Sequence, residues 1–142
     1  MQKQKILAMT FPKQNTSLGL EPSVLTVVPD GDNVEYLLDY HTDKYPDKEV
    51  EYYLCSVYIT GMADFIEWAK KHEKEKIIAG GYEPTINPDD FLEYAGRVIT
   101  GPCDDFNETM KQKGRIIKGI TNNKRIPRYD LYDVRLNQQI IR

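Results

Sequence analysis

The segment 52–59, YYLCSVYI, is the feature that most constrains the fold of this 142-residue chain. Its apolar side chains follow one another almost without a break instead of alternating with polar ones. A strand of this kind is covered on both faces, as the central strands of parallel sheets are. The segment therefore predicts a buried central strand in a sheet that is packed between helices.

Strand-like and helix-like segments alternate along the rest of the chain. In segment 60–75, Met62, Phe65, Ile66 and Ala69 recur at helical spacing, which predicts an amphipathic helix with a charged outer face. The other predicted strands are 5–10, 34–39, 76–79 and 97–100, with one more short strand conceivable at 116–118. The other predicted helices are 20–28, 87–95 and 104–113.

This alternation with short links predicts an α/β fold with a doubly wound, mainly parallel five-stranded sheet. Ligands bind such sheets beyond the carboxyl ends of the strands, at the point where the strand order reverses. Three loops follow strand ends in this way: 11–19, 56–61 and 80–85. We therefore expect a binding site in these loops.

The composition is that of a globular protein. Hydrophobic residues make up 40% and charged residues 29% of a length that suits one domain with its own core. No apolar run approaches the roughly 18 residues that cross a membrane, and the first residues lack a secretory cleavage pattern. With only two cysteines, Cys55 and Cys103, we expect a reduced, cytoplasmic protein with no membrane partner.

Charge is distributed unevenly behind the net value of −3. Residues 111–142 carry nine Lys or Arg and two acids, whereas residues 1–110 carry ten basic and twenty acidic residues. Either the C-terminal part folds back onto the acidic body or it meets a polar partner. We expect a domain over residues 1–120 followed by an extended basic tail over residues 121–142.

The loops resemble, in order and spacing, the cobalamin-binding-type domain that precedes the barrel of many radical S-adenosylmethionine enzymes. That family has PLGL after its first strand, a serine at a later strand end, then GGxHPT and GEGE. The matching strings here are SLGL at 17–20, SVYIT at 56–60, GGYEPT at 80–85 and GPCDDF at 101–106. IPRYDL at 126–131 resembles the linker that leads into the barrel, so the resemblance spans nearly the whole chain.

The resemblance implies a flavodoxin-like or Rossmann-like sheet with a ligand site at the strand ends. In the broader cobalamin-binding superfamily, a D-x-H-x-x-G loop, an S-x-L loop and a Gly-Gly loop hold the cofactor. Carried over, the S-x-L loop falls on Ser56 and Tyr58, and the Gly-Gly loop falls on Gly80 and Gly81. The family's loops also imply cofactor contacts by Asn15, Ser17, Thr60, Tyr82 and Gly101.

The first loop departs from the family. It reads Gln14-x-Thr16-x-x-Gly19, so only the glycine is retained. Neither Gln14 nor Thr16 is a good cobalt ligand, whereas imidazole is, so we expect no histidine-ligated cobalamin and no metal ligand. Some relatives bind cobalamin without this histidine and others have lost it, so cobalamin stays an open expectation. If it binds, residues 14–17 would lie below the corrin ring.

A second departure is the lack of a C-x-x-x-C-x-x-C motif. Cys55 and Cys103, 48 positions apart, cannot supply three thiolates to one cluster. We therefore expect no iron–sulfur cluster and no catalytic residues in this chain by itself. It is either a stand-alone copy of the accessory domain or a fragment.

Three functions remain open. The first is a non-catalytic domain that binds a corrinoid, a small nucleotide-like ligand or a protein partner at the strand ends. The second is a subunit that acts with a separate radical S-adenosylmethionine barrel protein. The third and least favoured is nucleic-acid binding by the basic tail with Tyr129 and Tyr132, because its charges are dispersed and no recognition motif is present.

Individual residues also have ordinary structural interpretations. Gly80 and Gly81 form either a simple turn or a ligand-facing loop, and Ser56 either bonds to the backbone or contacts a ligand. Cys55 is expected in the core and Cys103 at a partly exposed position. His72, at the end of a charged helix face, is expected to be solvated.

Overall fold

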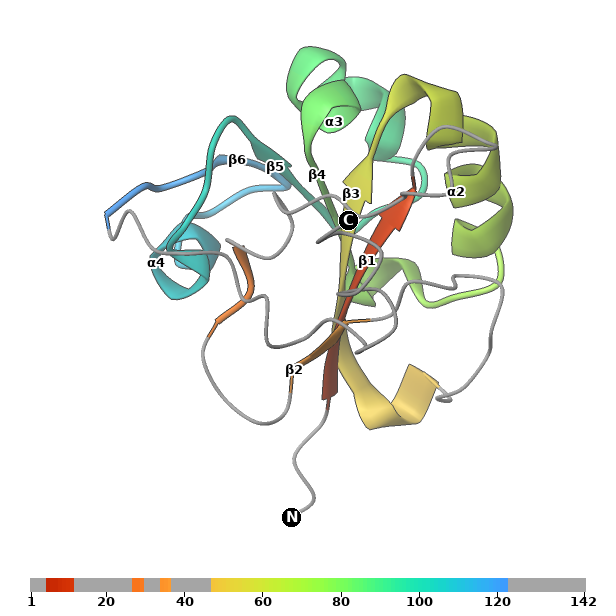
Figure 1. The fold of residues 1–142 in the computed structure, drawn as a ribbon, viewed down its shortest axis with the longest axis horizontal. Helices are drawn as coiled ribbons and strands as arrows, with labels where there is room; N and C mark the ends of the chain where they lie inside the picture. Colours follow the sequence, from red (N-terminus) through yellow and green to blue (C-terminus); the bar gives the residue numbers. More distant parts are fainter. Residues whose placement is uncertain (1–4, 12–26, 30–33, 37–46, 123–142) are drawn as a thin grey trace, which may run out of the picture.

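The computed structural model describes residues 5–11, 27–29, 34–36 and 47–122. Within these ranges the chain is an α/β fold around one sheet in which every pair of neighbouring strands is parallel (Figure 1). The strand order is β2-β1-β3-β4-β5-β6. The strands are β1 (Lys5–Phe11), β2 (Val34–Tyr36), β3 (Val50–Val57), β4 (Ile77–Gly80), β5 (Arg97–Thr100) and β6 (Ile116–Lys118).

The predicted α/β class with a parallel sheet is confirmed, but the predicted count of five strands is wrong. Strand β6 pairs with β5 and makes the sheet six-stranded. Its bounds are those of the additional short strand considered at 116–118, although only Ile117 of its three residues is buried. Pairing with β5, rather than local preference, decides this strand.

The central strand β3 lies two residues earlier than predicted. Its first residue, Val50, is buried and pairs with Lys5, while the chain leaves the sheet after Val57. A 3₁₀ turn, η2 (Ile59–Gly61), then leads directly into helix α2 (Met62–Ala69). The run of apolar residues therefore predicted the strand, but its C-terminal end is determined by the turn that leads into α2.

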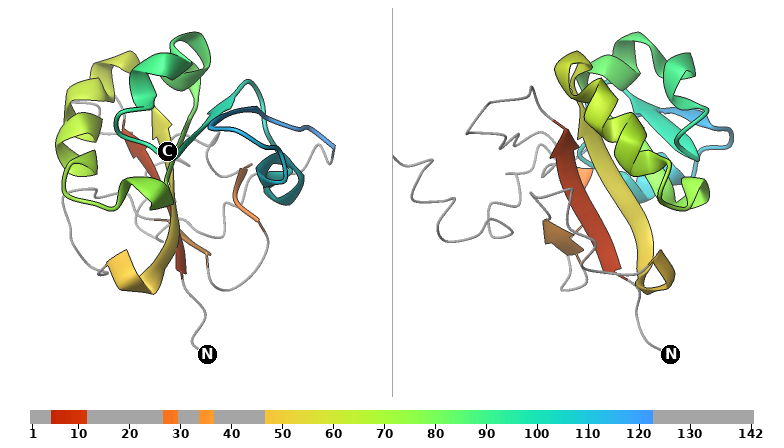
Figure 2. Two further views of the ribbon diagram at one scale, coloured as in Figure 1. Left: turned by 180° about the vertical axis from the view of Figure 1, so that it is seen from behind. Right: turned by 90° about the vertical axis from the view of Figure 1, so that its right-hand side faces the viewer.

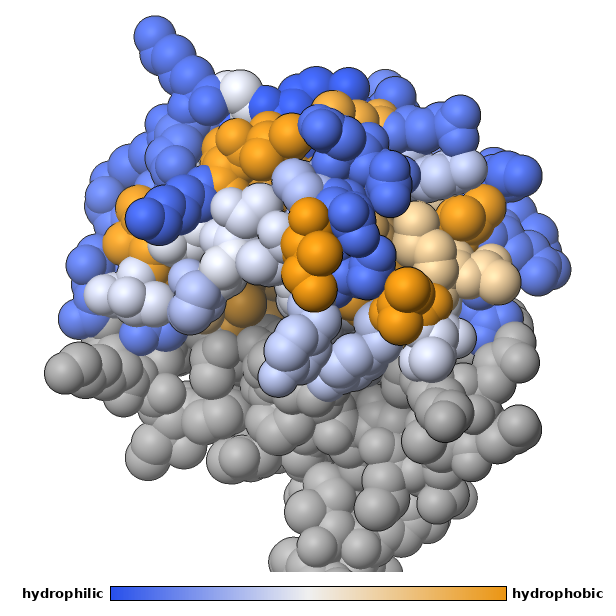
Figure 3. Space-filling model, turned by 90° about the horizontal axis from the view of Figure 1, so that it is seen from above, coloured by the Kyte–Doolittle hydropathy of each residue, from blue (hydrophilic) through white to orange (hydrophobic). Residues whose placement is uncertain are grey.

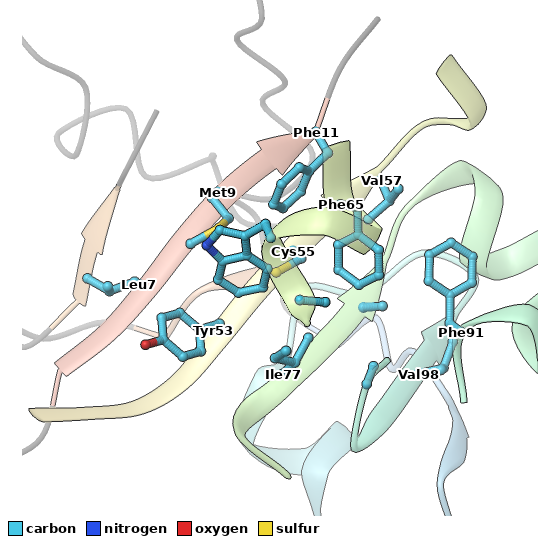
Figure 4. Close-up of a cluster of buried hydrophobic side chains, with 14 of the residues drawn as sticks. Leu7, Met9, Phe11, Tyr53, Cys55, Val57, Phe65, Ile77, Phe91 and Val98 are labelled. Carbon is cyan, nitrogen blue, oxygen red and sulfur yellow. The ribbon is translucent and has the colours of Figure 1, made fainter. Parts of the chain in front are cut away.

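Side chains alternate between the two faces of the sheet and build two separate cores. The first core lies under α2, where Phe65 and Ala69 are buried, as the helical spacing predicted (Figure 4). Trp68 is buried as well, whereas Met62 and Ile66 of the predicted set are only partly buried. Phe11 packs against both aromatic rings, with centroids 5.3 Å from Phe65 and 5.5 Å from Trp68. This face has a continuous aromatic core.

The second core lies on the opposite face. Helix α4 (Phe106–Met110) is on this side, across the sheet from α2 (Figure 2). The sheet residues of this core are Ile6, Ala8, Val34, Leu54, Ile78, Ile99 and Ile117, joined by Val28, Cys103 and Phe106. Leu54 on this face and Tyr53 and Cys55 on the other are buried, so β3 is buried on both faces, as its composition predicted.

Helix α3 (Tyr82–Ile86) was not predicted, because GGYEPT reads as a loop. Pro84 occupies its first turn, where a missing N–H costs nothing, so the proline does not prevent a helix. The helix predicted at 87–95 is instead the short 3₁₀ helix η4 (Pro88–Phe91), with Pro88 at its start. Asn87 does not cap it through its side chain but donates Nδ2–H to Glu83 Oε1 over 2.7 Å.

Helix α4 is shorter than the predicted 104–113. Asp105 caps its start by accepting a hydrogen bond from the Glu108 N–H at 3.1 Å. At and beyond its end, the Arg97 guanidinium from β5 donates to the carbonyls of Met110, Gln112 and Gly114. These carbonyls are therefore satisfied by a side chain rather than by further helical turns.

The prediction that His72 is solvated is wrong. Its side chain is 10% exposed, and its ring stacks on Trp68 with centroids 4.4 Å apart. His72 Nδ1 lies 2.8 Å from Asp47 Oδ1, and the Tyr53 hydroxyl donates to the same carboxylate oxygen. The end of α2 therefore turns inward onto the amino edge of the sheet, opposite the strand ends where a site is expected.

Several predicted segments lie outside the described residues. These are most of the helix at 20–28, the end of the strand at 34–39, the first loop and nearly all of the basic tail. Among the described helices, none has the length and apolarity to cross a membrane.

Candidate functional site

A cavity of about 570 Å³ opens at the carboxyl edge of the sheet, on the face of the second core. Its base consists of the apolar side chains Leu54, Ile78 and Ile99. Around this base stand residues of the β3 end, the Gly-Gly turn, helix α3 and the loop after β5. The remaining lining residues are Val27, Cys55, Ser56, Gly80, Gly81, Tyr82, Thr85, Ile86, Gly101, Pro102, Cys103, Asp104 and Thr121.

Gly81 allows the β3 and β4 ends to approach each other. Its φ of 101° and ψ of −158° lie in a region that only glycine adopts readily. A Cβ at this position would lie 2.9 Å from Ser56 Oγ and 3.4 Å from the Val57 nitrogen. The glycine is therefore required both by its backbone conformation and by the closeness of Ser56.

Ser56 is the buried polar side chain of this edge. It is 5% exposed, and its hydroxyl makes no hydrogen bond with any described residue. Ser56 therefore does not bond to the backbone of any described residue, which was one of its two predicted roles. A hydroxyl that lines a cavity without a partner is available to a bound molecule.

Thr85 joins the two glycine turns across the mouth of the cavity. Its Oγ1 accepts a hydrogen bond from the Gly101 N–H at 3.0 Å. Gly101 has a positive φ of 76°, and a Cβ placed on it would meet no atom within 4 Å. The hydrogen bond joins helix α3 to the loop after β5.

The loop after β5 contributes a buried carboxylate and a thiol. Asp104 is 7% exposed, and its Oδ1 accepts a hydrogen bond from the Asn122 N–H at 2.8 Å. Cys103 was expected to be partly exposed but is buried, with Sγ 3.3 Å from Thr109 Oγ1, because the loop folds down onto α4. Cys55 is buried as predicted, and burial raises the pKa of its thiol well above the usual value.

Aromatic and aliphatic side chains form the rim. The rings of Tyr58 and Tyr82 stack with centroids 5.5 Å apart and an angle of 28° between their planes. Ile59, Tyr82 and Ile86 are among the large hydrophobic side chains that stay exposed. Figure 3 looks down on this edge and shows hydrophobic side chains scattered among hydrophilic ones.

The structure brings five of the proposed cofactor contacts to one cavity, namely Ser56, Gly80, Gly81, Tyr82 and Gly101. Tyr58 lies beside them through its stacking on Tyr82, whereas Thr60 is exposed in η2 and does not line the cavity. The first-loop contacts Gln14, Asn15, Thr16, Ser17 and Gly19 lie outside the described residues.

Sequence reasoning missed Thr85, Ile86 and Asp104 as cavity residues. The first two belong to helix α3, which was not predicted. This helix is too short for its apolar residues to repeat at helical spacing in the sequence. Asp104 is the first residue of the helix predicted at 104–113, but α4 begins at Phe106 and Asp105 is the residue that caps it. A buried position cannot be recognised from an isolated polar residue in a loop.

Alanine substitutions of Gly81 and Gly101 distinguish the cost of backbone strain from the cost of a steric clash. We expect Gly81→Ala to lower the free energy of unfolding by about 3 kcal/mol, since alanine adds backbone strain and a clash with Ser56. Gly101→Ala adds only strain, about 1 kcal/mol. Urea unfolding measures both, and equal losses would contradict the role assigned to Ser56.

A double variant tests the contact directly. Because Ser56 Oγ is the nearest atom to the new Cβ, Gly81→Ala is expected to cost about 1 kcal/mol less when Ser56 is already alanine. Additive losses would show that strain alone accounts for the effect.

In the described residues, no group of three or more His, Cys, Asp or Glu side chains is arranged to hold a metal ion. Comparison of the chain with family models, curated proteins and solved structures gave no significant match.

Proposed function

We propose that the protein is a non-catalytic ligand-binding domain of the cobalamin-binding type, which takes the nucleotide tail of a corrinoid into the cavity at the strand ends. The observation that carries this proposal is the meeting of Ser56 and Gly81 at one edge of the cavity. These two residues come from separate loops, and the family resemblance assigns the tail to both.

The strand order supports the proposal. The order 2-1-3-4-5, extended here by a sixth strand, is that of flavodoxin-like doubly wound sheets, which bind ligands beyond the carboxyl ends of their strands. The cavity opens at that edge. We therefore propose a flavodoxin-like fold with its ligand site in the usual place.

The chemistry of the cavity suits a flat, largely apolar heterocycle. Leu54, Ile78 and Ile99 offer an apolar base, and Gly80 and Gly81 present backbone without side chains. Ser56 supplies a hydroxyl for one hydrogen bond. The benzimidazole nucleotide of a corrinoid has these features: an apolar ring system and a few polar atoms.

In this proposal the chain holds and orients the corrinoid, and Gln14, Thr16 and Ser17 lie below the ring without ligating cobalt through an imidazole. When bound, a corrinoid supplies a redox-active cobalt centre. The described residues contribute contacts and exclusion of water, not proton transfer. This is why we propose a binding role and not an enzyme.

Hydroxocobalamin is the direct test. After incubation and removal of free ligand, the protein is expected to retain the visible absorption of a corrinoid in a 1:1 ratio. Ser56→Ala is expected to weaken binding about fivefold to tenfold, since one hydrogen bond is lost. Asn107→Ala, an exposed change on α4, serves as the control with unchanged affinity. A colourless wild-type protein would refute the proposal.

A second function, as a subunit that acts with a separate radical S-adenosylmethionine barrel protein, is favoured by the exposed rim. Ile59, Tyr82 and Ile86 are each 68–69% exposed, and Tyr82 and Ile86 line the cavity. Exposed apolar side chains of this size often mark contact surfaces. Affinity purification should then recover a partner with an iron–sulfur cluster, and Ile86→Glu should abolish recovery; a partner without iron would refute this function.

A further inference from the structure

Strand β6 is the last strand in the order of the described sheet, and some of its backbone groups point away from β5 (Figure 1). The residues on either side of it bond to β5: the Arg115 carbonyl accepts from this strand at 2.7 Å, and the Gly119 N–H donates to it at 2.8 Å. In a parallel ladder, residues that bond to one neighbour alternate with residues that face the other way. Ile116 and Lys118 therefore direct their N–H and C=O groups outward.

The side chain of Gln112 pairs with the outward groups of Lys118. Its Nε2–H donates to the Lys118 carbonyl at 2.6 Å, and its Oε1 accepts from the Lys118 N–H at 3.2 Å. Nε2 also donates to the Thr109 carbonyl at 3.2 Å. A carboxamide carries the same donor and acceptor as a peptide group, so Gln112 bonds to Lys118 as the backbone of an adjacent strand would. At Lys118 the edge is thus paired with a side chain in place of a strand.

Ile116 has no such side-chain partner. Its outward N–H and C=O groups make no hydrogen bond within the part of the chain that the structure describes. Its side chain is 40% exposed and is one of the large hydrophobic side chains that remain exposed. Backbone groups left unpaired at a sheet edge can pair with another extended chain, and the side chains beside them provide selectivity. The edge at Ile116 is therefore open to strand addition.

The charge around β6 indicates which kind of chain fits this edge. Lys113 and Arg115 before the strand and Lys118 at its end are exposed, and residues 109–120 contain no acidic residue. Arg115 donates to three backbone carbonyls of segment 92–96, which hold its guanidinium in place without neutralising its charge. An extended chain with acidic side chains would meet cations at both ends of β6.

We propose that the outer edge of β6 is a docking site for an extended, acidic segment of a partner protein. The segment adds a strand beside Ile116 and displaces the Gln112 side chain from Lys118. Without a partner, the Gln112 carboxamide covers part of the edge and limits its pairing with other chains. The inference goes beyond the proposed function, since no residue from 112 to 118 lines the cavity.

Titration of the full chain with a peptide, followed by NMR of the backbone amides, tests the proposal. The probe is acetyl-Glu-Val-Thr-Val-Glu-amide, and its binding is expected to shift the amide resonances of Ile116 and Lys118. Gln112→Ala is expected to bind the peptide about fivefold more tightly, because the wild type first has to break the two hydrogen bonds between Gln112 and Lys118. The affinity should fall as salt is added, since the attracting charges are exposed.

Matched controls distinguish strand addition from a general effect of charge. Asn107→Ala removes another amide side chain, an exposed one on α4, and should bind the peptide as the wild type does. The same peptide with N-methyl groups on its valines and threonine keeps its charge but loses these backbone donors, so it should not bind. A peptide with lysine in place of glutamate should bind at least tenfold more weakly.

Each outcome supports the docking site or overturns it. Shifts centred on Ile116 and Lys118, with tighter binding by Gln112→Ala, support it. Unshifted amides at these residues in both proteins overturn it. Equal binding of the N-methylated peptide overturns strand addition, and equal binding of the lysine peptide overturns the acidic partner. Dimerisation of Gln112→Ala without peptide binding overturns the proposal as well, because the edge then fits a second copy of the chain.

Discussion

Gly119→Ala is expected to cause the largest loss of stability of any small substitution in the described part of the chain, about 3–4 kcal/mol. Gly119 follows β6, and its N–H donates to the Thr100 carbonyl at 2.8 Å. A Cβ on it would lie 2.2 Å from the Pro102 oxygen and 2.8 Å from Cys103 Cβ. Because the first of these is a backbone atom, relief requires a shift of the whole loop after β5.

The same substitution should damage the cavity. Pro102 and Cys103 form one of its walls, so a displaced loop changes the shape that a ligand meets. Urea unfolding and hydroxocobalamin binding measure the two effects, and we expect affinity to fall at least tenfold. Gly114→Ala is the control: its φ of +100° adds strain, but the nearest atom is 4.0 Å away, so about 1 kcal/mol and unchanged binding are expected. Equal effects of the two substitutions would contradict the clash.

Asp47→Ala is expected to lower the free energy of unfolding by about 3 kcal/mol without changing ligand affinity. The Asp47 carboxylate accepts hydrogen bonds from the Tyr53 hydroxyl, from the Glu73 N–H at 2.9 Å and from His72 Nδ1 at 2.8 Å. Burial, aided by this carboxylate, raises the pKa of Tyr53 far above its usual value, so its hydroxyl remains a donor. Alanine leaves these donors without an acceptor at the amino edge, far from the cavity.

The pH dependence has a definite sign. Desolvation by burial raises the pKa of Asp47, but the hydrogen bonds from Tyr53, His72 and Glu73 outweigh it and hold the pKa below its usual 3.8. A carboxyl whose pKa is lowered by folding stabilises the folded state above the unfolded pKa, and this contribution is lost as pH falls through the folded value. The stability difference between wild type and Asp47→Asn should therefore shrink below about pH 3.8. A difference that stays constant down to pH 2 would refute the role of the charge.

Secondary structure was predicted best where a residue pattern was compatible with only one structure. The apolar run of β3, the helical spacing of Phe65 and Ala69, and the exact bounds of β5 all follow from side chains that have to be buried. Helix α3 was not predicted, because the two glycines before it and the proline within it favour a turn. The proline lies where a helix tolerates it, and the Thr85 and Asn87 N–H groups donate to the Gly81 and Glu83 carbonyls, which closes the helical turn.

The sequence alone determined the parallel α/β class and the presence of Gly80, Gly81 and Gly101 at strand ends, since these follow from hydrophobic pattern and backbone freedom. Only the tertiary structure decided that Ser56 touches the Gly81 turn, that Asp104 and Cys103 are buried, and that the Thr10 hydroxyl is buried without a hydrogen bond to any described residue. Burial and hydrogen bonding depend on residues distant in the chain. A local pattern cannot encode them, because they arise only when the strands are aligned.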